Sequence, residues 1–154
     1  MSIYVNERYR IKRSAEQESL MKLLTDSKVF SSYANILAIS AVVGYLNKQY
    51  VSISKAATDG VQIINFSDEE KDLIDIIAYC HSKNQNILKS DDKYEIFESY
   101  ANGGFPILLD KLEISLDQTY YDQKSLLIQL YTLLATNDLE VSGEISIEDM
   151  ILVS

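Results

Sequence analysis

The two side chains best suited to nucleophilic chemistry are neighbours in this sequence. Cys80 is the single cysteine and His81 the single histidine among the 154 residues. Nucleophilic catalysis requires a nucleophile and a base in contact, but adjacent helical residues point about 100° apart. We therefore expect no dyad between them, with Cys80 in the core and His81 at the surface or its boundary. One histidine and one cysteine also cannot hold zinc without carboxylate ligands.

Carboxylate pairs are a second source of chemistry, and the sequence contains several of them. Acid–base catalysis needs such a pair in a pocket, with one pKa raised. Here the pairs fall at expected helix starts or on polar helix faces, where solvation and the helix dipole account for them. We expect none of the following groups to be catalytic: Asp68, Glu69 and Glu70; Asp72 and Asp75; Asp91 and Asp92; Glu148 and Asp149.

Residues 138–149 are a candidate calcium loop. They follow an expected helix and carry Asp138 and Asp149 at the first and last positions of such a loop. However, Glu140 is longer than the usual third ligand, and Asp149 replaces the long bidentate glutamate. Apolar residues that alternate about a central Ser-Gly pair fit a small β-hairpin better. Calcium binding stays open, and the hairpin is the preferred interpretation.

The adjacent glycines Gly103 and Gly104 do not form a nucleotide-binding loop. The spacing and the lysine that such a loop requires are absent. The eleven tyrosines could serve a protein interface, but most occupy core-facing or strand positions, where packing accounts for them. The sequence therefore predicts a protein that is not an enzyme and needs no cofactor.

Charge is distributed unevenly along the chain. A net charge of −9 argues against broad, sequence-independent binding to nucleic acid. The first 13 residues are an exception, because Arg8, Arg10, Lys12 and Arg13 are accompanied there only by Glu7. Any contact with DNA phosphates is therefore expected at this N-terminal segment. The carboxylate-rich remainder could instead imitate DNA and occupy the DNA channel of a partner.

Length and composition favour one domain, residues 1–154, with 1–13 as a basic strand or arm and 138–154 as a hairpin or tail. A chain of 154 residues, 47% hydrophobic, can bury a core without disulfides. The polar N-terminus has no signal-peptide pattern, so we expect a cytoplasmic protein. The uncharged stretch 29–47 approaches the length of a membrane span, but its serines and asparagines favour a buried helix.

Periodicity predicts a mainly α protein, a compact domain of five or six helices with a small β element. Residues 3–11 alternate like a strand with a basic outer face. Two short strands at 50–54 and 61–66 are expected to form a hairpin around Asp59 and Gly60. Helices are expected from Ser14 through Leu24, from after Ser31 or Ser32 to about Leu46, over 67–83, from Ser90 or Asp91, from Pro106 through Leu112, and from about Tyr121 to Ala135.

Cap residues mark two of these helices most clearly. Ser67 followed by Glu70 predicts a capping box, as does Ser14 followed by Gln17. The buried stripe expected on the helix after Ser67 consists of Leu73, Ile76, Ile77 and Cys80.

The stretch ESYANGGFP, residues 98–106, concentrates two glycines and the only proline. Asn102 or Gly103 can adopt the left-handed conformation that closes a helix, and Pro106 suits the first turn of the next one. We therefore expect one helix to stop here and another to begin at a tight corner.

The sequence EIFESYANGG, residues 95–104, resembles the dnd-system-associated protein 4 family, which is found beside DNA phosphorothioation genes. Two further features match in order and spacing: an apolar helix from Ala34 to Tyr45 and a second one from Leu73 to Ala78. The resemblance extends over roughly residues 20–115. It covers neither the basic N-terminal strand nor the tail from Asp117.

This resemblance implies a cytoplasmic bacterial protein that accompanies a DNA modification or restriction (defence) system, without a catalytic activity of its own. We expect an accessory or adaptor that binds protein components of that system, with no membrane partner. A DNA-binding accessory and an acidic DNA mimic stay as alternatives, and the oligomeric state is open. The matching motif could shape a helix end or form a contact surface, and it consists of Glu98, Tyr100, Asn102, Gly103 and Gly104.

Overall fold

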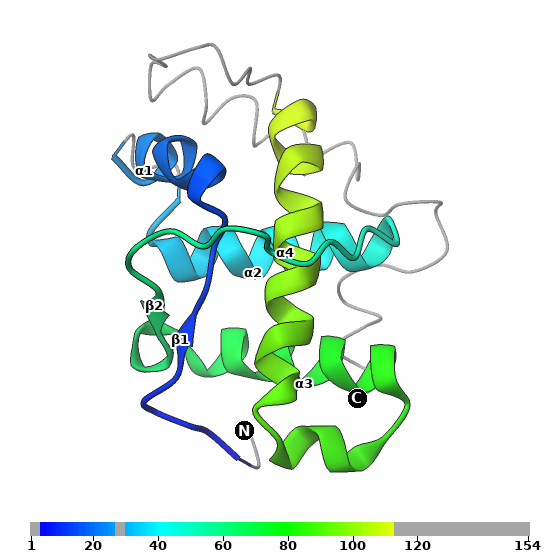
Figure 1. Cartoon of the computed structure of the whole chain (residues 1–154). Coiled ribbons are helices and arrows are strands. Elements are labelled where there is room, and N and C mark those ends of the chain that lie inside the picture. The colour runs from blue at the N-terminus through cyan, green and yellow to red at the C-terminus, as the bar shows by residue number, and fades with distance from the viewer. Residues whose placement is uncertain (1–3, 27–29, 113–154) are drawn as a thin grey trace.

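The computed structural model describes residues 4–26 and 30–112 of the chain (Figure 1). This part holds four α-helices and a two-stranded sheet, so the expected mainly α class with a small β element is confirmed. The expected helix at 121–135 and the segment 138–149 lie outside the described residues. The elements are β1 Arg10–Ile11, α1 Glu18–Asp26, α2 Tyr33–Leu46, β2 Val61–Gln62, α3 Asp68–Ser82 and α4 Asp92–Lys111, with 3-10 turns at Ala15–Gln17, Ile63–Asn65 and Gln85–Lys89.

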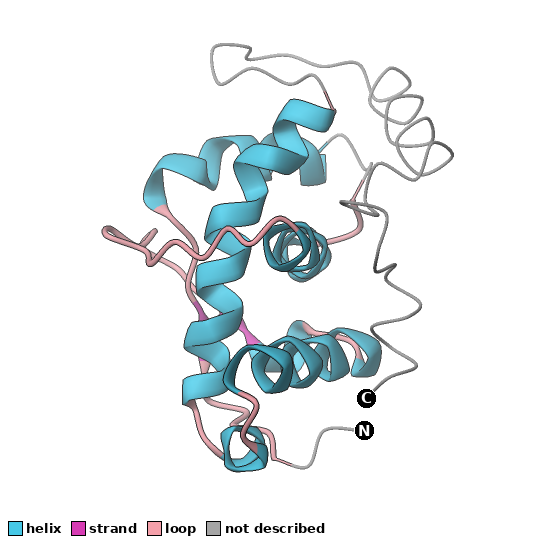
Figure 2. Cartoon of the chain, turned by 90° about the vertical axis from the view of Figure 1, so that its right-hand side faces the viewer, coloured by secondary structure: helices cyan, strands magenta, loops and turns pink. Residues whose placement is uncertain are grey.

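Helix α4 is the centre of the fold. It runs across both α2 and α3 (Figures 1 and 2), and most of its side chains are buried. Phe97, Phe105 and Leu108 are fully buried along it. The N-terminal segment with β1 lies along its outer side, as Figure 1 shows in blue. The elements that pack directly on it are α2, α3, β1 and the 3-10 turn Gln85–Lys89.

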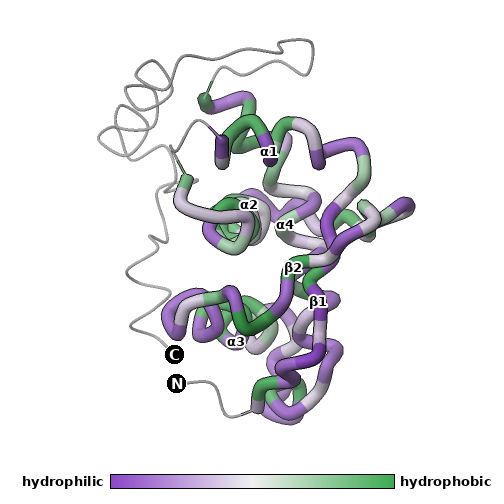
Figure 3. The backbone as a smooth tube through the Cα atoms, turned by 90° about the vertical axis from the view of Figure 1, so that its left-hand side faces the viewer, coloured by the Kyte–Doolittle hydropathy of each residue, from purple (hydrophilic) through white to green (hydrophobic). Residues whose placement is uncertain are grey.

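Helix α2 is buried on most of its sides, as its uncharged sequence predicts. Figure 3 shows it between α1 and α3, and its buried residues do not keep to one stripe. Ser32 caps its start, since the hydroxyl of Ser32 accepts a hydrogen bond from the Asn35 backbone at 3.1 Å. None of the described helices is both long enough and apolar enough to cross a membrane.

The expected helix stop at residues 98–106 is wrong, because α4 continues through it to Lys111. The glycines serve helix crossing instead. A Cβ on Gly104 would overlap the Ser40 carbonyl oxygen and lie 2.9 Å from the Gly44 Cα atom. A Cβ on Gly44 would lie 2.9 Å from the Tyr100 carbonyl carbon. The backbones of α2 and α4 thus approach so closely that only glycine fits.

Pro106 is accommodated inside α4 by a side chain from another element. Proline has no backbone N–H, so the carbonyl of Asn102, four residues earlier, lacks its helical donor. The Gln17 side-chain amide donates to that carbonyl at 3.2 Å. The proline ring itself is exposed, and the missing hydrogen bond is replaced from outside the helix.

The capping predictions hold for α3 but not for α1. Ser67 and Glu70 form the reciprocal capping box, with hydrogen bonds of 2.8 and 3.1 Å. Ser14 makes no side-chain cap, and its backbone instead bridges to Ala56. The buried stripe of α3 is shifted in part, because Leu73 and Cys80 are only half-buried. Its buried residues are Ile74, Ile76, Ile77 and Ala78.

The expected hairpin between 50–54 and 61–66 is wrong. β2 pairs antiparallel with β1, Arg10 opposite Gln62 and Ile11 opposite Val61. Residues 50–54 form no strand, and the Val51 N–H donates instead to the Ser99 carbonyl of α4 at 3.1 Å. Residues 63–65 turn into a 3-10 helix. The alternating apolar pattern was present, but its partner lies elsewhere in the chain.

Candidate interaction site

Glu98 fastens the N-terminal segment to α4. Its side chain is 5% exposed, and its Oε2 atom accepts hydrogen bonds from the Lys12 backbone at 2.7 Å and the Tyr9 hydroxyl at 3.1 Å. Burial raises the pKa of Glu98 to about 7, although these hydrogen bonds and the charge of Lys12 oppose the shift. No described lysine or arginine forms an ion pair with it. The carboxyl therefore acts as a buried acceptor that positions the strand.

Tyr100 supports an aromatic stack at the surface. Its hydroxyl lies 2.7 Å from the Nδ1 atom of His81, and burial raises the pKa of Tyr100. The His81 ring in turn stacks on Tyr50, with ring centroids 4.7 Å apart. Tyr50 also meets Tyr100 edge-on at 4.9 Å. The three rings hold one another in fixed orientations.

Cys80 and His81 have separate tyrosine neighbours. The Tyr45 pKa rises to about 12, first through burial and then through the neighbouring Cys80. Cys80 itself is half-buried, where the core was expected, and His81 is exposed. The two side chains thus lie in different surroundings, Cys80 beside Tyr45 and His81 against Tyr50 and Tyr100.

Asn102 and Gly103 hold the loop that follows α2. The Asn102 side-chain amide donates to the Val51 carbonyl at 2.9 Å, and a Cβ on Gly103 would lie 2.8 Å from the Gln49 carbonyl carbon. Together with Gly104 at the α2 crossing, the residues of the resemblance motif thus contact the N-terminal segment, α2, the loop after α2, and His81 of α3. Four of them are buried: Glu98, Tyr100, Gly103 and Gly104.

The exposed part of this region is what we call the Tyr50 patch, formed by Tyr50, Val51 and His81. Tyr50 is 44% and Val51 46% exposed, and His81 is exposed beside them. Large apolar side chains so exposed on a fixed framework are typical of contact surfaces. No sequence pattern pointed to this patch, because residues 50–54 alternate like a strand and the stack joins three distant segments.

The basic N-terminal residues do not all face solvent. Arg8, Arg10 and Lys12 are exposed, whereas Arg13 is only 6% exposed. The Arg13 guanidinium pairs with Glu18 at 3.3 Å, lies over a tyrosine ring and donates to a backbone carbonyl. The alternation of side chains along a strand could have predicted the burial of Arg13, since Tyr9 and Ile11 were already assigned to the inner side of the strand.

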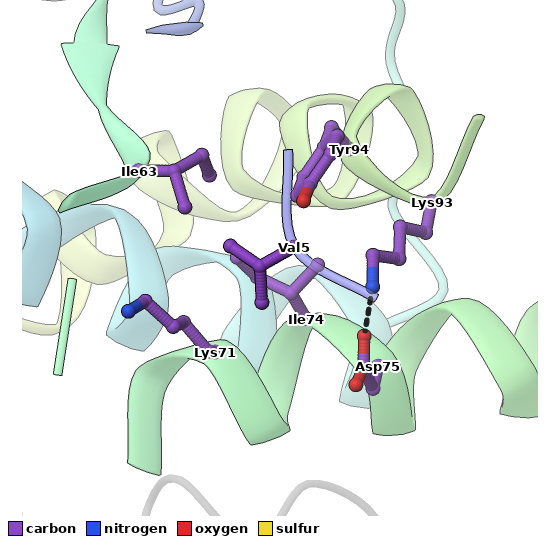
Figure 4. Close-up of a pocket in the computed structure, with 7 residues that line it drawn as sticks. All are labelled: Val5, Ile63, Lys71, Ile74, Asp75, Lys93 and Tyr94. Carbon is purple, nitrogen blue, oxygen red and sulfur yellow. Dashed lines mark ion pairs between the residues drawn. The ribbon is translucent and has the colours of Figure 1, made fainter. Parts of the chain in front are cut away.

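A buried ion pair joins α3 to α4. Figure 4 shows Lys93 reaching Asp75, with the Nζ and Oδ1 atoms 2.8 Å apart. Lys93 is 1% exposed, and its ammonium also donates to the Leu88 carbonyl at 3.1 Å. The indentation around this pair leaves no room for a water-sized sphere. The pair therefore ties two helices together and offers no substrate pocket.

Metal-ligating groups are not gathered in the described ranges 4–26 and 30–112. No three histidine, cysteine, aspartate or glutamate side chains there lie together as a metal site would require. The candidate calcium segment 138–149 lies outside these ranges.

Fold and site together define a mainly helical protein organised on one largely buried helix, α4. A family model, DNA sulphur modification system-associated protein 4, matches residues 10–140, and the chain belongs to this family. The match confirms the resemblance found in EIFESYANGG. It also covers β1 and most of the tail from Asp117, which that resemblance left out. No curated protein and no solved structure matches the chain.

Proposed function

We propose that this chain is a non-enzymatic accessory or adaptor protein of a bacterial DNA sulphur-modification system, acting in the cytoplasm through contacts with the system's other proteins. Family membership ties it to such a system. The observation that carries the proposal is the Tyr50 patch, because it is exposed and at the same time rigidly built.

The Tyr50 patch has the properties of a protein-binding hot spot. Tyrosine is enriched in hot spots because it supplies a large contact area with few rotatable bonds. Here Tyr50 is stacked on His81 and braced by Tyr100, so little side-chain entropy is left to lose on binding. The patch therefore suits a protein partner that inserts an apolar or aromatic side chain against Tyr50.

The surroundings of the potential nucleophiles support a non-enzymatic role. The His81 ring is engaged by Tyr100 and Tyr50, while Cys80 lies beside Tyr45. Glu98, whose pKa is raised as that of a general acid would be, accepts hydrogen bonds from the fold's own backbone and is closed off from solvent. Each of these groups has a structural partner.

An acidic DNA-mimic function has less support. The carboxylates Asp68, Glu69 and Glu70 occupy the first turn of α3, where they complement the helix dipole, and Glu70 closes the capping box. Their position is explained by the helix they begin.

The test of the adaptor function is recovery of the system's proteins. We would co-produce the tagged full chain with the proteins of its own sulphur-modification system and capture it after nuclease treatment. We expect at least one of these proteins to be retained by the parent chain and about tenfold less by Tyr50→Ala, the effect of removing one hot-spot side chain.

The matched control is Tyr79→Ala, because Tyr79 is 40% exposed but belongs to no ring stack among the described residues. It should leave recovery unchanged. The proposal fails if the parent chain retains none of the system's proteins. It also fails if the isolated chain transforms DNA or a nucleotide and a point mutation abolishes that activity.

A further inference from the structure

We infer that a second surface, the basic strip of Arg8, Arg10, Lys12 and Lys55, binds the phosphate backbone of duplex DNA. This binding goes beyond the adaptor function and does not depend on the Tyr50 patch. It rests on the register of the N-terminal strand, on its anchoring to α4, and on a lysine that comes from a distant loop.

The register places three cations on one side of the strand. Tyr9 stacks on Tyr94 with centroids 4.4 Å apart, and Ile11 and Arg13 are buried, so from Tyr9 onward the odd-numbered residues face inward. Arg8, Arg10 and Lys12 consequently face outward, and all three are exposed. Arg10 and Lys12 are alternate residues, about 6.6 Å apart as in a strand, and Arg8 precedes them in the turn that the Tyr9 N–H closes onto the Asn6 carbonyl at 3.0 Å.

Lys55 is an exposed cation on a distant segment whose backbone pairs with the chain just beyond these residues. Beyond the β1–β2 pair, Ser14 bridges to Ala56, and the Ala15 N–H donates to the Lys55 carbonyl at 2.9 Å. Lys55 is exposed. It therefore adds an exposed cation near the end of the strip, whereas the guanidinium of Arg13, which the sequence assigned there, is buried against Glu18.

The strip is held in place before any ligand arrives. Glu98 binds the backbone of Lys12, the Tyr94 hydroxyl accepts the Asn6 N–H at 2.9 Å, and Asp91 accepts the Asn6 amide at 3.0 Å. In Figure 1 the segment follows α4 closely. A fixed strip loses little conformational entropy on binding, in contrast to a free basic arm.

The cationic groups of the strip have donors to offer. Within the described residues the Arg8 side chain makes no hydrogen bond or ion pair. The Lys12 ammonium lies over the Tyr9 ring, 6.0 Å from its centroid, and Arg10 makes one long bond of 3.4 Å to the Gly60 carbonyl. Guanidinium and ammonium groups in this state bind phosphate oxygens well. Since the family belongs to a DNA sulphur-modification system, duplex DNA is the polyanion within reach.

The net charge of −9 weakens binding of the strip to DNA. Glu7 and Asp59 are exposed beside the strip, and the chain as a whole repels DNA. At physiological salt, repulsion is screened beyond about 8 Å, and the strip acts on phosphates at shorter range. The contact is therefore weak and strongly dependent on salt.

The experiment measures binding of the purified full chain to a labelled duplex DNA of arbitrary sequence, by anisotropy over a series of salt concentrations. The test variant combines Arg8→Gln, Arg10→Gln, Lys12→Gln and Lys55→Gln. The matched control combines Lys22→Gln, Lys48→Gln, Lys83→Gln and Lys89→Gln, which removes the same charge from other exposed positions.

We expect the slope of log affinity against log salt to fall by about 3 to 4 in the test variant, near 0.9 for each phosphate that is no longer neutralised. Affinity at low salt should fall at least about tenfold. The control should keep most of the slope. All eight side chains are exposed, so both variants should unfold at the temperature of the parent.

Three results would overturn the inference: no binding by the parent at the lowest salt, an equal loss in the control, or equal affinity for duplex RNA of the same length. An equal loss of affinity in the control would show that binding depends only on net charge. Equal affinity for RNA would show that the strip does not select DNA. The adaptor proposal is untouched by each of these, because its test follows nuclease treatment and depends on Tyr50.

Discussion

The two halves of α4 hold their neighbours by opposite means. The first half, to about Tyr100, uses polar side chains: Lys93 pairs with Asp75, and Glu98 accepts from the N-terminal strand. The second half relies mainly on the absence of side chains, because Gly103 and Gly104 admit backbone at contact distance, with one side-chain hydrogen bond from Asn102 to the Val51 carbonyl beside them. A polar contact tolerates a replacement that keeps its hydrogen bonds, whereas a close backbone contact tolerates no added atom.

The largest effect is expected from adding one carbon to the second half. Gly104→Ala would drive a Cβ into the Ser40 carbonyl, and backbone cannot move aside as a flexible side chain can. We expect a loss of about 4 kcal/mol in the free energy of unfolding and about 10 °C in Tm. Thermal and denaturant unfolding measure it.

The control for this prediction is Asp110→Ala, an exposed position further along the same helix. It should change stability by less than about 0.5 kcal/mol. If Gly104→Ala is equally silent, the close crossing of α2 and α4 is not a requirement of the fold, and the contrast between the halves disappears.

This crossing also marks the limit of what the sequence predicts. A Gly-Gly-x-Pro run is compatible with a helix end and with a helix crossing, and local chemistry favours the end. The deciding partners are Ser40 and Gly44, which lie in another helix, and Gln17, which replaces the bond that Pro106 removes. The Gly-Gly-x-Pro run itself does not predict these partners.

Helix caps and the alternation of side chains along a strand, by contrast, depend on residues that are close in the sequence. The capping box of Ser67 and Glu70 forms as predicted, because both partners are within one turn. The burial of Arg13 follows from the same alternation that placed Ile11 inside, so it was predictable in principle. The pairing of β1 with β2 and the Tyr50 stack were not, since each joins segments that are far apart in the sequence.

The first half of α4 can be probed by pH through Glu98. Its folded pKa of about 7 exceeds its usual 4.5 because of burial, so the folded state binds the proton more tightly than the unfolded state. The resulting stabilisation is full below about pH 4.5 and is lost as pH rises to about 7. Relative to Glu98→Gln, the parent should therefore lose about 2–3 kcal/mol between pH 5 and pH 8.

Chemical denaturation at a series of pH values gives this difference directly. The control is Asp110→Asn, because Asp110 is exposed further along α4 and is not among the groups that shift the pKa of Glu98. Its difference from the parent should be independent of pH over the same range. A flat difference for Glu98→Gln as well would show that the Glu98 carboxyl is not desolvated and that the strand is anchored by other contacts.

The smallest effect is expected where the two halves of α4 meet, at Tyr100. Tyr100→Phe removes only the hydroxyl that faces His81 and keeps the ring against Tyr50 and Tyr45. We expect a loss of about 1 kcal/mol, the net worth of one hydrogen bond, in unfolding measurements, with Tyr79→Phe as the silent control. Because the hydroxyl holds His81, the variant should also weaken capture of the partner through the Tyr50 patch by a few-fold. Reduced stability with full capture would mean that stacking alone orients the patch, so the polar half of α4 would support the fold without shaping the interaction surface.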